Sequence, residues 1–104
     1  MSQLSIVIGK DRIQGKLVGT NKWEFWFGSK KFTIDSSNTT DDAVEVLLMK
    51  STILKGKELH PNIWTVEYSF YGSSAWGSVS IWYNFEFNIE SMKAIVKSET
   101  NTDA

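Results

Sequence analysis

The strand-like segment 78–90 carries the residues most able to bind a ligand or a partner. In the sequence SVSIWYNFEFNIE the odd positions are apolar and the even positions polar, as in a strand with one buried face. Trp82 breaks this pattern, because it is a large aromatic among the polar positions, with Glu86 nearby. The preceding segment has Glu67 and Tyr71 on its own alternate positions. We therefore expect these four side chains to share one face of a sheet.

The two segments read as an antiparallel hairpin with a loop at 72–77. This loop length would place Tyr71 opposite Ser78 and Glu67 opposite Trp82. Directly opposed residues have Cβ atoms about 5 Å apart, so Glu67 and Trp82 are expected to touch.

A second tryptophan occupies a comparable position near the start of the chain. In WEFWF at 23–27, alternation puts Trp26 and Glu24 on the face opposite Trp23 and Phe25. Trp76 lies in the Gly/Ser-rich loop, where it either faces a partner or folds back onto its own sheet. The candidate partner-binding residues are Glu24, Trp26, Glu67, Tyr71, Trp76, Trp82 and Glu86.

Two interpretations of Trp26 and Trp82 remain open. They could fill a second small core, if the sheet curls on itself or the tail folds across it. They could instead form an interface, because Trp and Tyr are enriched at interface centres and charged residues at the rim.

The residue inventory argues against several kinds of chemistry. Without cysteine the chain has no disulfide, thiolate metal site or cysteine nucleophile, and His60 is its only histidine. Glu67 and Glu86 would lie about 13 Å apart in this register, too far for a glycosidase pair. A site built from Glu24 and Glu67 remains a minor alternative. We predict no catalytic residue, no cofactor and no metal.

Charge and hydropathy suggest the setting in which the chain works. The net charge is −1 and the pI about 5.8, so no overall basic field favours nucleic acid. No apolar run approaches the roughly 18 residues of a membrane span. The start MSQLSIVIGK does not resemble a signal peptide. We expect a cytoplasmic protein that binds neither nucleic acid nor membrane.

The elements that position these residues predict an α+β fold in a single domain, 1–104. The spacing of Val44, Leu47 and Leu48 predicts a helix over 40–55, packed on one face of a curved antiparallel sheet of about 6–7 strands. Segment 91–97 could be a strand or a short helix, and the turn-like Glu90-Ser91 favours the strand. Residues 98–104 are expected to be a frayed tail.

These observations predict a small, non-catalytic protein-binding module. By analogy of size and composition, its most concrete form is a bacterial immunity or inhibitor protein that neutralises a cognate toxin, such as a nuclease. Acidic residues would then meet the basic substrate groove of the toxin. The alternative is a small-ligand or carbohydrate binder that stacks Trp26, Trp76 or Trp82 on its ligand. An exposed aromatic sheet face is also compatible with a homodimer.

Overall fold

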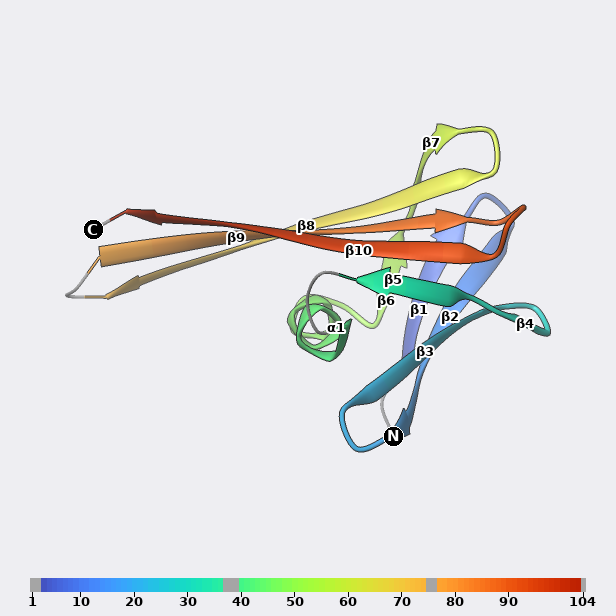
Figure 1. Cartoon of the computed structure of the whole chain (residues 1–104), viewed down its shortest axis with the longest axis horizontal. Helices are drawn as coiled ribbons and strands as arrows, with labels where there is room; N and C mark the ends of the chain where they lie inside the picture. The colour runs from blue at the N-terminus through green and yellow to red at the C-terminus, as the bar shows by residue number, and fades with distance from the viewer. Residues whose placement is uncertain (1–2, 37–39, 75–76, 104) are drawn as a thin grey trace.

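A computed structural model describes residues 3–36, 40–74 and 77–103, and these residues form ten strands and one helix (Figure 1). In chain order the elements are β1 (Gln3–Ile8), β2 (Asp11–Gly19), β3 (Lys22–Phe27), β4 (Lys30–Lys31), β5 (Thr33–Ser36), α1 (Thr40–Leu48), β6 (Ile53–Lys55), β7 (Lys57–His60), β8 (Ile63–Ser74), β9 (Gly77–Asn88) and β10 (Lys93–Asp103). The chain is thus mostly β-strand with one helix.

The strands form two five-stranded sheets that pack against each other. Sheet A has the order β4-β3-β2-β1-β6, and sheet B has the order β5-β10-β9-β8-β7. Each sheet is mixed, because β6 pairs in parallel with β1, and β5 in parallel with β10. The predicted single antiparallel sheet of 6–7 strands was therefore wrong. Two short segments, 30–36 and 53–60, each give one strand to sheet A and one to sheet B, which sequence periodicity did not reveal.

The chain crosses between the sheets at both edges. At one edge it passes from β4 to β5 through Phe32, whose N–H donates to the Phe25 carbonyl at 2.8 Å. At the other edge it passes from β6 to β7 through Gly56, whose N–H donates to the Val7 carbonyl at 2.8 Å. Strands that switch sheets form the corners of packed sheets. These two crossings fix how sheet A sits on sheet B.

Gly56 has no room for a side chain at its corner, and we expect its replacement by alanine to destabilise the fold. An added Cβ would lie 2.8 Å from Ile8 Cγ2 and 3.3 Å from Ile6 Cγ2, and both methyl groups belong to β-branched core side chains. Overpacking of this kind costs about 1–3 kcal/mol of unfolding free energy, which urea denaturation would measure. Gly19→Ala is the control, because its Cβ would meet only Lys22 at 3.6 Å. Equal stability of the two variants would contradict the corner geometry.

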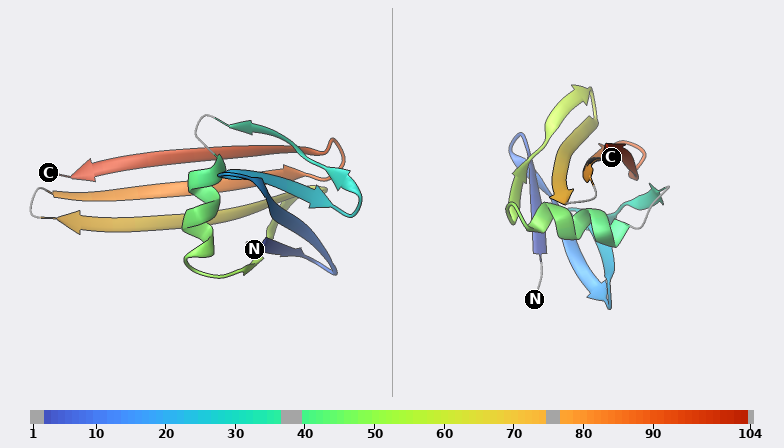
Figure 2. Two further views of the ribbon diagram at one scale, coloured as in Figure 1. Left: turned by 90° about the horizontal axis from the view of Figure 1, so that it is seen from below. Right: turned by 90° about the vertical axis from the view of Figure 1, so that its left-hand side faces the viewer.

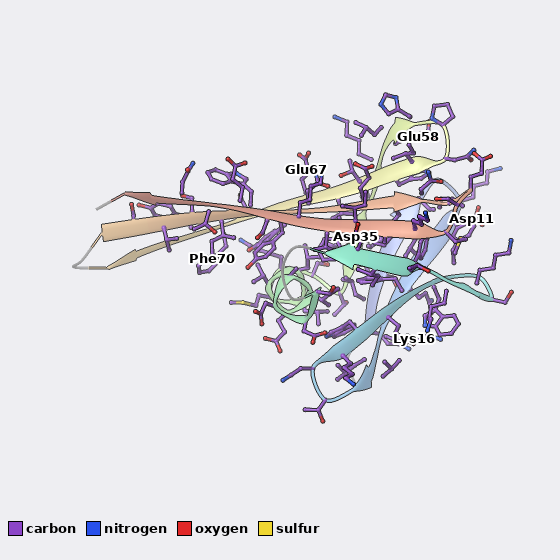
Figure 3. The ribbon with its side chains drawn as sticks, in the orientation of Figure 1. Asp11, Lys16, Asp35, Glu58, Glu67 and Phe70 are labelled. Carbon is purple, nitrogen blue, oxygen red and sulfur yellow. The ribbon has the colours of Figure 1, made fainter. Side chains whose placement is uncertain are left out.

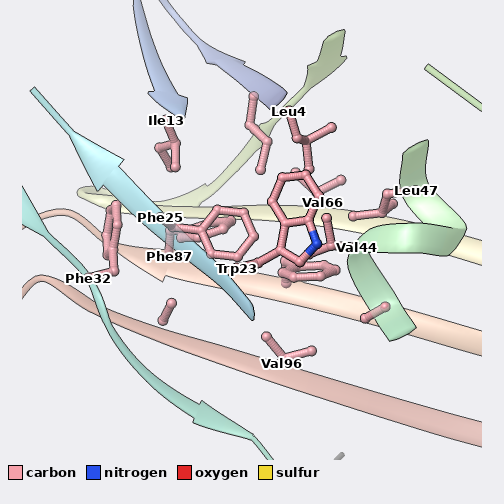
Figure 4. Packing of buried hydrophobic residues seen from close by; sticks show 14 of the residues in the cluster. Leu4, Ile13, Trp23, Phe25, Phe32, Val44, Leu47, Val66, Phe87 and Val96 are labelled. Atoms are coloured by element: carbon pink, nitrogen blue, oxygen red, sulfur yellow. The ribbon is translucent and has the colours of Figure 1, made fainter. Parts of the chain in front are cut away.

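The core lies between the sheets and is filled by the apolar positions that alternation predicted. Phe25 of sheet A meets Phe85 and Phe87 of sheet B edge-on, with ring centroids 5.7 and 5.4 Å apart. Figure 4 shows Phe25 and Phe87 among apolar side chains from both sheets and from the helix. Ala94 and Val96 of β10 are buried in the same core.

The helix is shorter than its predicted range of 40–55. It ends at Leu48, after which the Ser51 hydroxyl accepts from the Ile53 N–H and donates to the Ile53 carbonyl. Serine that bonds to nearby backbone competes with helix formation. The following β-branched and apolar residues then pair with β1 instead of extending the helix. At the other end of the helix, the Asp41 carboxylate accepts from the Trp23 N–H at 3.1 Å and ties α1 to β3.

The three longest strands continue past the two-sheet body. We call the arm residues 67–74 of β8, 77–84 of β9 and 97–103 of β10, which follow the last row of fully buried core residues. Figure 2 shows α1 lying across one face of these long strands. We call that face inner and the opposite face outer. The strand favoured for 91–97 is confirmed from Lys93 onward, where it forms the start of β10. The predicted frayed tail was wrong for residues 98–103, because they continue β10 and pair with β9.

Candidate functional site

Trp82 lies on the outer face of the arm, in its middle strand. Its side chain is 44% exposed, between Ser69 of β8 and Glu99 of β10. Tyr71 is 68% exposed and lies diagonally across the strand pair, a separation that aromatic side chains can span. The interpretation that Trp82 fills a second core was wrong. The two sheets bury the other face, and the end of the chain pairs alongside β9 instead of folding over it.

The register of the hairpin differs from the predicted one by two residues. Trp82 is opposite Ser69, and Glu67 is opposite Asn84, so the predicted direct pair of Glu67 with Trp82 was wrong. The strands extend further than the Gly/Ser composition suggested, because β8 continues to Ser74 and β9 begins at Gly77. A shift of two residues keeps every side chain on its predicted face, since strand alternation has a period of two.

A groove of about 530 Å³ runs along this outer face. Its lining includes Glu67, Asn84 and Lys97, which form one row across the three strands, together with Trp82 and Glu99. We call the Trp82 face the set Glu67, Tyr71, Trp82, Asn84, Lys97 and Glu99. It combines two exposed aromatic side chains with two carboxylates, an ammonium group and an amide.

The amide of Asn84 is held in a defined orientation. The buried Thr65 hydroxyl donates to Asn84 Oδ1 at 2.8 Å, so the Asn84 amide nitrogen is directed away from Thr65. Tyr83, the next residue, projects to the inner face. There, burial raises the pKa of its phenol, and the Asp42 carboxylate raises it further. Tyr83 therefore stays neutral near pH 7, and the charges of the groove come from Glu67, Lys97 and Glu99.

Two of the predicted site residues lie on the other sheet. Glu24 and Trp26 are on the outer face of sheet A, and the two outer faces point to opposite sides of the molecule. Figure 3 shows this separation, with Glu67 on one side and Lys16, which pairs with Glu24, on the other. The structure therefore does not bring Glu24 and Trp26 together with Trp82.

Trp26 has its own local partners. Glu24 forms a salt bridge with Lys31 at 2.9 Å, and the Lys31 ammonium lies 6.0 Å from the Trp26 ring centroid. Trp26 is half-buried, and its Nε1 atom is buried without a hydrogen-bond partner among the described residues. Trp26 is thus more enclosed than Trp82 and less available to a partner.

The other two predicted residues are separate from the groove. Glu86 shares the outer face of β9 but lies opposite Thr65 and Ile95, four residues and about 13 Å from Trp82. Trp76 falls outside the described residues.

Sequence reasoning did not include Asn84, Lys97 and Glu99 in the site. Asn84 was placed on the correct face, but its role depends on the true hairpin register. Lys97 and Glu99 belong to β10, and their position next to β9 depends on the sheet order. Alternation of Lys97, Glu99 and Asn101 could have suggested a strand with a polar face, but the polar composition of 98–104 suggested a frayed end instead.

Comparison with known proteins gives no further guide: no protein-family model, curated protein or solved structure matches the chain. Within residues 3–36, 40–74 and 77–103, no group of three or more acidic or histidine side chains is arranged to hold a metal ion. In the same residues, no helix has the length and apolar character needed to cross a membrane.

Proposed function

We propose that the chain is a non-catalytic module that binds a protein partner through the Trp82 face. The observation that carries this proposal is the exposure of Trp82 and Tyr71 on a three-stranded surface with charged neighbours. Binding energy at protein interfaces concentrates in a few Trp, Tyr and Arg side chains surrounded by a more polar rim. Glu67, Lys97 and Glu99 supply such a rim around Trp82.

The charge distribution favours a basic partner. Sheet A with its turns carries the basic residues Lys10, Arg12, Lys16, Lys22, Lys30, Lys31 and Lys55, and only the acidic residues Asp11 and Glu24. The remaining chain carries ten acidic residues and four lysines. The part of the chain outside sheet A is therefore acidic, although the net charge is only −1. On the Trp82 face the two carboxylates of Glu67 and Glu99 outnumber the single ammonium group of Lys97. Complementary potentials of this kind accelerate association and select partners.

The most concrete form of the proposal is an immunity or inhibitor protein for a toxin with a basic active-site groove, such as a nuclease. Glu67 and Glu99 would face basic side chains that otherwise contact the phosphates of the substrate. Trp82 would fill an apolar pocket beside them. The inhibitor would act by occupying the active-site groove of the toxin, so no catalytic residue is needed in this chain.

Capture of partners on two matched variants tests the proposal. Glu67→Lys/Trp82→Ala alters the Trp82 face, and Glu24→Lys/Trp26→Ala makes the same two residue changes on sheet A. Wild type and both variants would be immobilised and exposed to lysate of the source cell with neighbouring gene products co-expressed. We expect a stoichiometric partner on wild type and on the sheet A variant, and its loss from the Trp82-face variant.

Circular dichroism would first establish that both variants are folded. Loss of the partner from the sheet A variant alone would move the interface to Trp26 and contradict the proposal. Retention of the partner by both variants would contradict it as well, because neither outer tryptophan would then be needed.

A second candidate function is the binding of a small ligand such as an oligosaccharide. The groove of about 530 Å³ has the volume of a typical ligand site, and Trp82 could stack on a sugar ring beside Asn84 and the carboxylates. Titration with a panel of oligosaccharides, with tryptophan fluorescence as the readout, distinguishes a ligand-binding function from a protein-binding one. A saturable change that Trp82→Ala removes, without any captured protein, would favour the ligand.

A further inference from the structure

In the part of the chain that the structure describes, the arm has two open edges along which the backbone has no neighbouring strand. At one edge, β7 pairs only with the segment Ile63–Thr65 at the start of β8. At the other edge, β5 pairs only with Lys93–Val96 at the start of β10. Among the described residues, no strand pairs with the outward edge of β8 from 66 to 74 or with that of β10 from 97 to 103. Such edges offer backbone N–H and C=O groups to another strand.

The two edges differ in how they are protected against pairing. Along β10, Lys97, Glu99 and Asn101 place charged and polar side chains on the edge, which discourages another strand. Along β8, residues 68–72 read YSFYG and carry no charge, no proline and no bulge relative to β9. The β8 edge is therefore the one suited to accept a strand.

Apolar side chains extend along the inner face of the same region. Phe70 and Ile81 are directly opposite each other, with Val79 further along β9, and all three are only partly buried. Figure 3 shows Phe70 on the inner face, on the side away from Glu67. A strand added to β8 would place its own side chains next to Phe70 and cover part of this surface.

We propose that two copies of the chain form a symmetric dimer by antiparallel pairing of their β8 edges, centred on Phe70. Centring on Phe70 makes the segment self-complementary. Each Phe70 lies beside its symmetry mate, and each Tyr68 lies opposite Gly72, so the uncharged residues of one edge pair only with uncharged residues of the other. The two Glu67 carboxylates are then six positions apart, about 20 Å, so they do not repel each other. The result is one continuous six-stranded sheet across a two-fold axis, the commonest symmetry of soluble oligomers.

This arrangement has a consequence for the outer face. Residues directly opposite in an antiparallel pair project to the same side, so both Trp82 faces lie on the same surface of the dimer. The dimer contact uses the edge of β8 and the inner face. It leaves the groove of each copy open.

Cysteine cross-linking tests the proposed register, because the natural chain has no cysteine. Phe70 and Thr100 are both opposite Ile81, so they lie in one row at the two edges of the arm and on the same face. Opposed residues across the two-fold axis have Cα atoms about 4.5–5.5 Å apart, a separation that a disulfide can span. We expect Phe70→Cys to form a disulfide-linked dimer under mild oxidation, whereas Thr100→Cys remains monomeric on a non-reducing gel.

Light scattering after size exclusion gives the independent readout. Wild type is expected at twice the chain mass of 11.8 kDa, and Phe70→Lys at the mass of one chain. Thr100→Lys, with the same added charge on the other edge, is expected to remain dimeric. A wild-type mass of one chain at millimolar concentration would overturn the proposal, as would equal cross-linking of the two cysteine variants.

Discussion

Phe25→Ala is expected to lower the free energy of unfolding by about 3–5 kcal/mol, the typical loss for a fully buried phenylalanine. Phe25 is completely buried and makes edge-to-face contacts with Phe85 and Phe87 of the other sheet. Its removal leaves a cavity between the two sheets. Paired strands hold both walls of this cavity in place, so we expect that it does not close. Small domains have only about 5–15 kcal/mol of stability, so this single change would bring the protein close to unfolding.

Urea denaturation followed by circular dichroism measures this loss, with Glu24→Ala as the control on the same strand. Glu24 faces solvent and contributes a partly exposed salt bridge with Lys31, which is worth about 0–1 kcal/mol. A loss below about 1 kcal/mol for Phe25→Ala would contradict the arrangement of the core, because the ring would then have to be exposed.

Trp82→Ala is expected to weaken partner binding at least about 30-fold while changing stability by less than about 1 kcal/mol. Interface hot spots contribute about 2 kcal/mol or more, and each 1.4 kcal/mol is a factor of about ten in affinity. Trp82 projects from the outer face and is not part of the core cluster, so its loss creates no cavity. Calorimetric titration of the captured partner gives the affinity, and urea denaturation the stability.

The opposite pattern would contradict this description of Trp82. A stability loss of about 3–5 kcal/mol would show that the indole is packed in a core. Unchanged affinity would show that the partner contacts another surface.

Local sequence patterns predicted the faces of the strands better than their partners. Strand alternation correctly assigned Phe25 to the core and Trp82 to the opposite face, because the period of two depends only on the strand itself. Glycine also marks two of the turns, because Gly9 and Gly28 follow β1 and β3 and both adopt the positive φ that favours this residue. The order of strands was not predictable in this way, because it depends on contacts between distant segments.

The errors at chain crossings have a common physical origin. Segments such as 30–36 and 53–60 are too short to show a period, and their strands form only by pairing with an existing sheet edge. The same dependence on tertiary contacts shortened the helix, because Ile53 and Leu54 pair with β1 and so cannot extend α1. For the site, Lys97 and Glu99 were missed because their place beside Trp82 depends on the pairing of β10 with β9, which the local sequence does not specify.

The most direct test of the interface is hydroxyl-radical footprinting of the protein alone and in complex with its captured partner. Trp and Tyr react with hydroxyl radicals in proportion to their exposure, and the reaction reports on individual side chains. If the partner binds the Trp82 face, oxidation of Trp82 and Tyr71 will slow in the complex, while oxidation of Trp26 will not change. Slower oxidation of Trp26, with Trp82 and Tyr71 still reacting as in the free protein, would contradict the proposed function and place the interface on sheet A.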